Sequence, residues 1–310
     1  MALDLTLPLV NSIALGSLYT LMALGLTLTF SVTKIPNFAH AEFITIGGYV
    51  TAILVNFTAL SPVIALIIAF ISSGLVALLS DELVFKPLHK RGARPLFLLV
   101  ASIGVGLVIR YILFSFADLT GNITIQTNVS VYPIARFGRA YITNLHLIII
   151  PATIAIVILL HVIFHYTLMG KALRALADNE DLARVSGIRI YKLRRVAWIL
   201  AGGLAGLAGG LWSINLLIDP NLGWDSLLRV FAASILGGLT SFWGTIIGGY
   251  IIGFAENVGI AFLNSLFGIN TAYRPLISFS IIVIVFLLRP QGFAGLDIRA
   301  ILPKVRGRGS

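Results

Sequence analysis

The sequence predicts an all-α integral membrane protein, a polytopic bundle of about eight or nine transmembrane helices. Hydrophobic residues make up 58% of the 310 residues, only 11% are charged, and the mean hydropathy is +1.00, whereas soluble domains are roughly a quarter charged. Apolar runs of about 20 residues recur along the whole chain, and each can cross a hydrocarbon core of about 30 Å as a helix. These runs do not alternate apolar and polar residues as barrel strands do, so a helical bundle is expected.

Seven spans are predicted directly from these runs, at residues 7–32, 43–60, 62–80, 95–116, 145–166, 195–217 and 275–289. The stretch 229–263 is too long for one ordinary span, and glycine pairs and hydroxyl residues interrupt it around residues 237–244. We therefore expect two short or broken segments there, which gives about nine crossings, with eight as the alternative. The whole chain, residues 1–310, is expected to form one transmembrane domain.

The basic residues predict which loops face the cytoplasm. Sixteen of the 22 Lys and Arg residues lie in three segments, Lys86–Arg94, Lys171–Arg195 and Arg289–Arg308. Basic loops stay on the cytoplasmic side of a membrane protein. The loop at 167–195 and the tail at 290–310 are therefore expected in the cytoplasm, and the protein is expected to lie in the cytoplasmic (inner) membrane. The N-terminus and the loop at 117–144 are then outside. This topology explains the net charge of +10 without nucleic-acid binding.

The external loop at 117–144 and the absence of cysteine add two further expectations. The loop alternates β-branched and polar residues, which predicts a short hairpin over the outer mouth. The chain contains no cysteine, which excludes disulfides and thiolate metal sites.

The first polar interruption of the apolar pattern follows Lys34. Pro36 removes a backbone donor, and Asn37, His40 and Glu42 follow within six residues before the apolar pattern resumes. A charged group at membrane depth costs about 2.5 to 3.5 kcal/mol on insertion scales, so it usually faces a cavity or a partner. Two interpretations stay open: a solvated turn at the cytoplasmic rim, or a discontinuous helix that lines the solute path.

A second interruption resembles the first. Glu256 and Asn257 follow the break at Gly237-Gly238, and the tetrapeptide Ile46–Tyr49 recurs as Ile247–Tyr250. Paired breaks indicate a weak internal repeat, with the solute pathway at the interface between the repeats. The predicted pathway residues are Asn37, His40, Glu42, Gly47, Gly237, Gly238, Glu256 and Asn257.

The cytoplasmic loop is expected to contain a short amphipathic helix. Asp178 or Asn179 can cap its start, acidic residues follow near its positive end, and Gly187 can end it. Leu182, Ala183 and Val185 form a small apolar ridge that suits a groove on a cytoplasmic partner, although a basic helix resting on lipid headgroups is the alternative. The predicted coupling residues are Lys171, Arg174, Asn179, Glu180, Leu182, Ala183, Arg184 and Gly187.

Other polar and small residues are given structural roles. Gly202, Gly206 and Gly210 recur every four residues and predict close helix packing, within the chain or against another subunit. Arg110 is placed near a helix end, where its side chain would reach the interface, as are His161 and His165. No spacing matches a metal site, a catalytic triad or a phosphate loop, so the chain is expected to be non-catalytic.

Together these segments resemble the LivH family of branched-chain amino acid permeases, within a wider group that includes ribose-type sugar permeases. The resemblance spans nearly the whole chain and is carried by Asn37–Phe43 with Gly47 and Tyr49, by Gly170–Gly187, by Ala201–Gly210, by Leu236–Gly238 and by Arg289–Phe293. The family usually has glycine where this chain has Ala41. That departure leaves the substrate open, because relatives of this type also move urea, short amides or other amino acids.

The resemblance implies a set of partners for an importer driven by an ATP-binding cassette. A second permease subunit, LivM-like, would pair with this chain around a central pathway. Two cytoplasmic ATPase subunits would dock on the coupling helices and hold the ATP and Mg, with no cofactor in this chain. An extracytoplasmic solute-binding protein would deliver the amino acid, and alternating access would move it across the membrane.

Other classes of function remain compatible with the same residues. A proton- or ion-coupled secondary transporter could use His40, Glu42 and Glu256 as a titrating relay. A channel-like facilitator and a membrane-embedded enzyme are further alternatives. Recovery of ATPase subunits with the purified chain would favour the importer, and transport without ATP would favour the relay.

Overall fold

The computed structural model describes residues 5–58, 60–138, 140–288 and 292 of the chain. The helices are α1 (Thr6–Thr33), α2 (His40–Thr58), α3 (Pro62–Ser80), α4 (Lys86–Lys90), α5 (Pro95–Leu119), α6 (Asn144–Tyr166), α7 (Leu168–Asp178), α8 (Glu180–Val185), α9 (Ile190–Asn215), α10 (Leu222–Gly237), α11 (Phe242–Phe267) and α12 (Arg274–Leu288). A π-helical turn, Asp81–Phe85, joins α3 to α4, and a 3₁₀ turn, Thr271–Tyr273, precedes α12. The strands β1 (Pro133–Phe137) and β2 (Ala140–Thr143) form the expected antiparallel hairpin.

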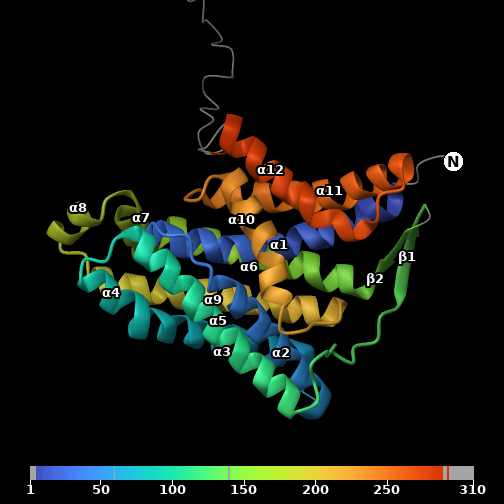
Figure 1. Cartoon of the computed structure of the whole chain (residues 1–310), viewed down its shortest axis with the longest axis horizontal. Coiled ribbons are helices and arrows are strands. Elements are labelled where there is room, and N and C mark those ends of the chain that lie inside the picture. Colours follow the sequence, from blue (N-terminus) through green and yellow to red (C-terminus); the bar gives the residue numbers. More distant parts are fainter. Residues whose placement is uncertain (1–4, 59, 139, 289–291, 293–310) are drawn as a thin grey trace, which may run out of the picture.

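The helices form an elongated bundle with two distinct ends (Figure 1). The hairpin end carries β1, β2 and the start of α1, and the opposite end, called the α8 end, carries α4, α7 and α8. The segment expected to be external and the segment expected to be cytoplasmic therefore lie at opposite ends of the molecule.

The chain crosses between the two ends nine times in the part that the structure describes. Eight helical segments are long and apolar enough to span a membrane. The ninth is α10. The chain reaches the hairpin end after α9, where Ile218 bridges Ile125. It is at the α8 end when α11 begins, where Trp243 lies near His161 of α6. The 16 residues of α10 extend only about 24 Å at 1.5 Å per residue. The prediction of an all-α polytopic membrane protein is confirmed.

The packing of the helices is repeated within the chain. α1 and α9 are the most buried helices; α11 packs along α1, and α3 packs along α9. Each central helix is followed by a break and then by a second helix, α2 or α10, and the starts of these two helices meet. The two Ile-Gly-Gly-Tyr segments lie on α2 and α11. In the repeated packing α2 corresponds to α10, not to α11, so the tetrapeptide match does not reflect this repeat.

Small residues form the seams between the central helices and their neighbours. A Cβ built at Gly202 or Gly206 would overlap α3 at Ser73, and one built at Gly210 would overlap Thr51 of α2. The glycine strip therefore packs within the chain, which was one of the two predicted alternatives. On the other seam, Gly249 and Gly253 of α11 lie directly against the backbone of α1.

Three predicted boundaries differ from the structure. The loop expected from residue 81 is helical through Lys90, because the buried pair between Asp81 and Arg194 keeps an acidic residue inside the helix. The external loop expected at 218–228 ends at residue 221, since α10 begins at Leu222. The break at Gly238–Ser241 is confirmed, but α11 beyond it is one continuous helix of 26 residues. The basic tail at 290–310 lies, apart from residue 292, outside the described residues.

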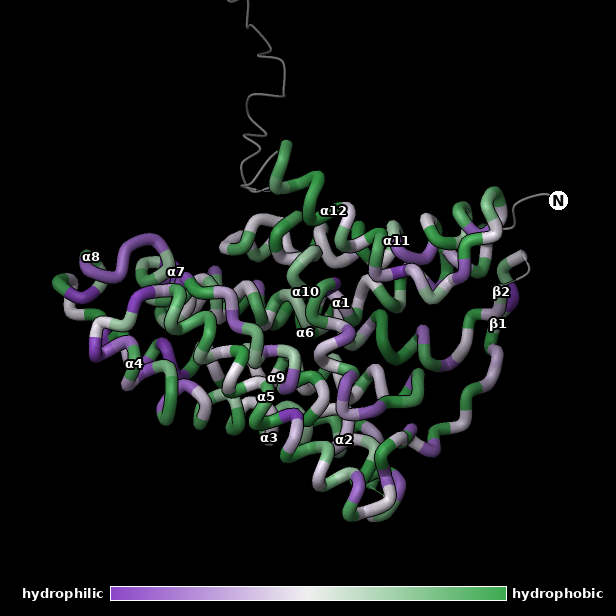
Figure 2. Tube along the Cα trace, viewed as in Figure 1, coloured by the Kyte–Doolittle hydropathy of each residue, from purple (hydrophilic) through white to green (hydrophobic). Residues whose placement is uncertain are grey.

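The outer surface of the bundle is apolar and its α8 end is hydrophilic. Large side chains such as Val108, Leu159 and Ile67 are more than half exposed on the sides of the helices, as expected for a surface that faces lipid. Figure 2 shows hydrophilic residues gathered around α4, α7 and α8. The chain is therefore a multi-pass membrane protein.

Candidate functional site

The polar side chains that follow Pro36 in the first break are buried, although Lys34 at its start is exposed. Lys34 closes α1 in a left-handed conformation with φ of 56°, and Asn37 Oδ1 accepts the Ala39 N–H at 3.1 Å. His40 Nε2 lies 2.9 Å from the Met22 carbonyl oxygen. Asn37 and His40 are 3% and 0% exposed. This burial excludes the interpretation of the break as a solvated turn.

The start of α2 meets the start of α10 inside the bundle. The Gly223 N–H donates to Thr45 Oγ1 at 3.0 Å, and a Cβ at Gly223 would overlap the Ala41 carbonyl oxygen. Two interrupted helices with converging N-termini form the geometry that transporters use for anionic groups at a repeat interface. The break that pairs with the first is therefore at residues 216–221, ahead of α10, and not at the predicted Gly237-Gly238. Pro220 in this segment is a sequence signal that the prediction of paired breaks did not use.

Glu42 is held in the bundle by Arg110 of α5. Arg110 Nε donates to Glu42 Oε1 at 3.0 Å, and the guanidinium lies 4.4 Å from the ring centroid of Trp224 on α10. Glu42 is 0% and Arg110 is 9% exposed. The placement of Arg110 at a helix end with a snorkelling side chain is therefore wrong, because its partner is a buried carboxylate on another helix.

Glu256 is the centre of a second buried polar cluster. It accepts hydrogen bonds from Arg229 Nε at 3.1 Å, from the Tyr19 hydroxyl at 2.9 Å and from the Ser278 hydroxyl. Sequence reasoning missed Arg229. The available signal was an arginine inside an apolar segment, which needs a buried acid as its partner. Asn257 lies beside this cluster, and its Nδ2 donates to the Gly253 carbonyl oxygen at 3.0 Å.

The predicted titrating relay is not a connected chain of groups. His40, Glu42 and Glu256 each bond to a different partner, and no hydrogen bond among the described residues joins one of the three to another. Their separation removes the geometric support for proton transfer along this route.

The predicted glycines sit at backbone contacts between helices. A Cβ at Gly47 would overlap Gly206 of α9, and Gly237 faces Gly244 at the turn between α10 and α11. Gly238 has φ of 87°, a conformation that side chains disfavour. These glycines hold helices close together, and their contribution to a solute pathway stays a prediction.

The predicted coupling helix is a pair of helices. α7 buries Leu173 and Leu176 in a small apolar cluster with α1 and α9, and Asn179 then starts α8 by accepting the Leu182 N–H at 2.9 Å. Gly187 ends the segment with φ of 80°. The predicted cap and stop are therefore confirmed.

The predicted coupling residues differ in exposure. Leu182 is 62% and Val185 is 81% exposed, whereas Ala183 is 3% exposed and packs inward. Lys171, Arg174, Arg184 and Gly187 are exposed, as is Asn179. Glu180 pairs with Arg184 at 2.8 Å. The exposed apolar ridge thus consists of Leu182 and Val185 alone.

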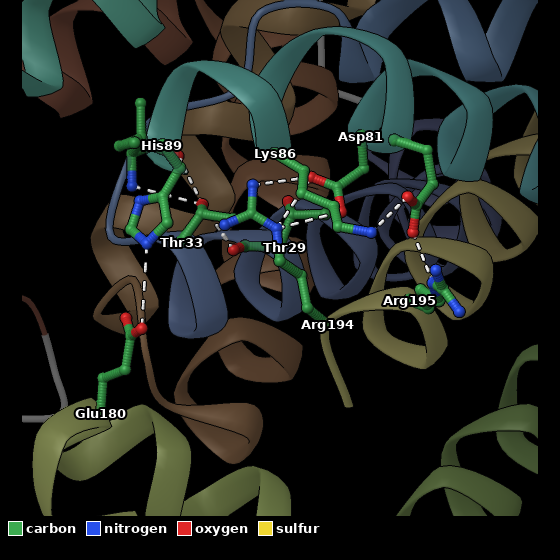
Figure 3. A network of polar contacts seen from close by, with 10 residues as sticks. Thr29, Thr33, Asp81, Lys86, His89, Glu180, Arg194 and Arg195 are labelled. Carbon is green, nitrogen blue, oxygen red and sulfur yellow. Dashed lines mark hydrogen bonds and ion pairs between the residues drawn. The ribbon is translucent and has the colours of Figure 1, made fainter. Parts of the chain in front are cut away.

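Polar contacts tie this segment to the bundle, as Figure 3 shows. Glu180 Oε1 lies 3.8 Å from His89 Nε2 of α4, and α4 continues from the π-helical turn whose Asp81 pairs with Arg194. The Lys34 ammonium, at the end of α1, donates to the Ala177 carbonyl oxygen of α7. These contacts connect α8 to α4 and α7 to the end of α1.

The fold and these sites define a multi-pass helical permease with an interrupted helix pair in its interior and two short helices, α7 and α8, at its hydrophilic end. The family model described as "Branched-chain amino acid transport system / permease component" matches residues 9–286. The chain belongs to this family.

Named permeases align with this chain over half of its length or more. A probable branched-chain amino acid transport permease protein LivH from Methanocaldococcus jannaschii is 34% identical over 93% of this chain and 91% of its own. The high-affinity LivH permease of Escherichia coli K12 is 26% identical over 92% and 94% of the two chains. The ribose import permease RbsC of Bacillus subtilis is 32% identical over about half of each chain, 51% and 49%.

Proposed function

We propose that this chain is the translocating subunit of an ATP-driven importer for branched-chain amino acids. The observation that carries the proposal is the family match over residues 9–286, in a bundle whose two interrupted helices meet in its interior. Urea or a short amide is the alternative substrate. The chain itself is non-catalytic in this proposal, and ATP and Mg bind in separate ATPase subunits.

The proposed assembly contains four kinds of chain. A second, LivM-like permease subunit pairs with this one, two ATPase subunits bind at the α8 end, and a solute-binding protein delivers the amino acid at the hairpin end. The whole assembly lies in the cytoplasmic (inner) membrane. Alternating access is supported by the converging starts of α2 and α10, because separating the two halves of the bundle would open their junction.

Reconstitution tests the transport activity. Proteoliposomes that contain the four kinds of chain, with L-leucine outside and ATP within, should accumulate labelled leucine. Vesicles that enclose ADP in place of ATP should not. Equal accumulation driven by a proton or sodium gradient without ATP would overturn the importer and support a secondary transporter.

The docking role is carried by the exposed apolar side chains of α8. Leu182 and Val185 point away from the bundle while the buried Ala183 anchors the helix, and exposed apolar groups between charged neighbours mark a protein interface. The double variant L182Q/V185Q should lower ATP-driven uptake without changing the amount of folded permease. The matched control is L119Q, which removes a side chain that is 86% exposed at the hairpin end. Equal uptake in both variants would exclude the docking surface.

The proposed orientation places the α8 end in the cytoplasm. The basic segments 86–94 and 171–195 both lie at that end, in agreement with the distribution of cationic residues in inner-membrane proteins. The N-terminus is then outside and the C-terminus inside. The absence of cysteine permits a direct test: N128C should react with an impermeant maleimide on intact cells, and D181C only after permeabilisation. The opposite pattern would invert the topology and remove the docking proposal.

A further inference from the structure

A cavity of about 190 Å³ lies between the helices near the hairpin end, away from the junction of α2 and α10. It is lined by the second and third turns of α1, by the starts of α6 and α12, by the end of α9 and by the middle of α11. Its polar lining consists of Asn11, His146, Asn215, Asn257 and Arg274, and the rest of the lining is aliphatic. Because a water molecule occupies about 30 Å³ of liquid, this space exceeds a single structural water.

His146 presents an unpaired hydrogen-bond donor in this lining. The Thr143 N–H points at His146 Nδ1 at 3.3 Å, so Nδ1 accepts and, in the neutral ring, the proton is assigned to Nε2. Nε2 is buried and has no hydrogen-bond partner in the described part of the chain. A buried donor without an acceptor is unfavourable, which makes an acceptor in the cavity favourable.

Arg274 supplies a second unpaired donor and the positive charge. Its Nε is buried without a partner, and no hydrogen bond or ion pair of its guanidinium occurs among the described residues. The neighbouring carboxylate of Glu256 is already occupied by Arg229, Tyr19 and Ser278. A cation left unpaired in a cavity favours an anionic occupant.

The amide and aliphatic groups indicate what else the occupant carries. Asn257, which is 4% exposed, uses Nδ2 on the Gly253 carbonyl, so its Oδ1 can accept a hydrogen bond from an ammonium group. Leu145 and Ile149 of α6 and Leu216 supply an apolar wall. The lining thus combines donors for a carboxylate, an acceptor for an ammonium and a surface for a short aliphatic side chain.

We propose that this cavity is a binding site for the carboxylate of a small aliphatic amino acid, held by Arg274 and His146. The inference rests on the proposed function for the identity of the solute, but the carboxylate specificity follows from the two unpaired donors alone. The site would receive the solute at the hairpin end before it reaches the interior junction.

Binding to the permease complex in nanodiscs, without the solute-binding protein, tests the site. The probes are L-leucine, isovalerate, which keeps the carboxylate and the branched chain, and isopentylamine, which keeps the chain and the ammonium. Leucine and isovalerate should bind and isopentylamine should not. The variant R274Q should weaken binding of both carboxylates by about 10-fold or more, since it removes a charge-assisted hydrogen bond, and R274K should fall between. The matched control R136Q, which removes an exposed cation of β1, should bind as the parent chain does.

A nearly isosteric variant keeps the test valid if R274Q does not fold. N215D adds a negative charge to the cavity and should weaken isovalerate binding while strengthening that of isopentylamine. Equal binding of isovalerate and isopentylamine by the parent chain, or unchanged isovalerate binding in folded R274Q and N215D, would overturn the carboxylate site. ATP-driven uptake by the same variants, reconstituted in proteoliposomes, separates the two proposals. If R274Q takes up leucine with an unchanged KM, only the binding site is overturned. If the assembly still binds isovalerate but takes up no branched-chain amino acid, only the importer is overturned.

Discussion

Two adjacent acidic residues pair with two adjacent arginines, and burial should make their contributions to stability very different. Asp81 accepts hydrogen bonds from Arg194 Nε at 2.8 and 3.0 Å and from Nη2 at 2.6 Å, and the two side chains are 1% and 7% exposed. Glu82 pairs with Arg195 through side chains that are 26% and 54% exposed. Both pairs join the π-helical turn after α3 to α9, and Glu82 also pairs with Lys86. Asp81 and Arg194 are nearly inaccessible to water, whereas Glu82 and Arg195 are accessible.

D81N should lower the free energy of unfolding by about 3 to 5 kcal/mol, because it leaves Arg194 buried without a counter-charge. E82Q should produce no measurable change, since water solvates the released partner. The difference can be measured by titrating the purified chain in mild detergent with a denaturing detergent and following tryptophan fluorescence, to which Trp198, stacked on Phe85 at 5.0 Å, contributes.

A double variant isolates the pairwise contribution. D81N/R194M replaces both partners and should recover much of the loss, because the variant no longer buries an unpaired charge. Two results would refute the argument that burial decides the outcome. The first is an equal loss of stability in D81N and E82Q. The second is a double variant whose loss equals the sum of the losses of D81N and R194M measured separately.

Two further changes test local packing. G47V should prevent folding, because a side chain at residue 47 would overlap the backbone of Gly206. The matched control G104A, with open space around it, should keep its stability or gain up to about 1 kcal/mol. The yield of monodisperse protein in size-exclusion chromatography reports both variants, and equal yields would argue against a close α2–α9 seam. N179A should destabilise α8 by about 1 kcal/mol, since it removes the acceptor for the Leu182 N–H. Hydrogen exchange of the α8 amides should become faster. Unchanged exchange would contradict the capping role of Asn179.

Local signals in the sequence predicted much of the fold. Hydropathy located seven spans within a few residues, because apolar length is the property that a membrane selects. Asn179 and Gly187 marked the start and the end of α8 because capping depends on the nearest few residues. The hairpin after α5 was predicted from alternation in the same way.

Contacts between distant residues were the part that the sequence could not supply. Arg110 looked like a snorkelling residue because its partner, Glu42, is 68 positions away. The helical continuation after Ser80 depends on the pairing of Asp81 with Arg194, 113 positions away. A polar residue in an apolar segment therefore predicts that a partner exists, but the fold is needed to identify it.

The pairing of both Arg110 and Arg229 with buried acids has a consequence for electrical neutrality. Arg110 sits against Glu42 and Arg229 against Glu256, so each of these two clusters carries almost no net charge. The proposed transport of branched-chain amino acids fits this balance, because a zwitterionic amino acid carries no net charge and meets no net field from either cluster.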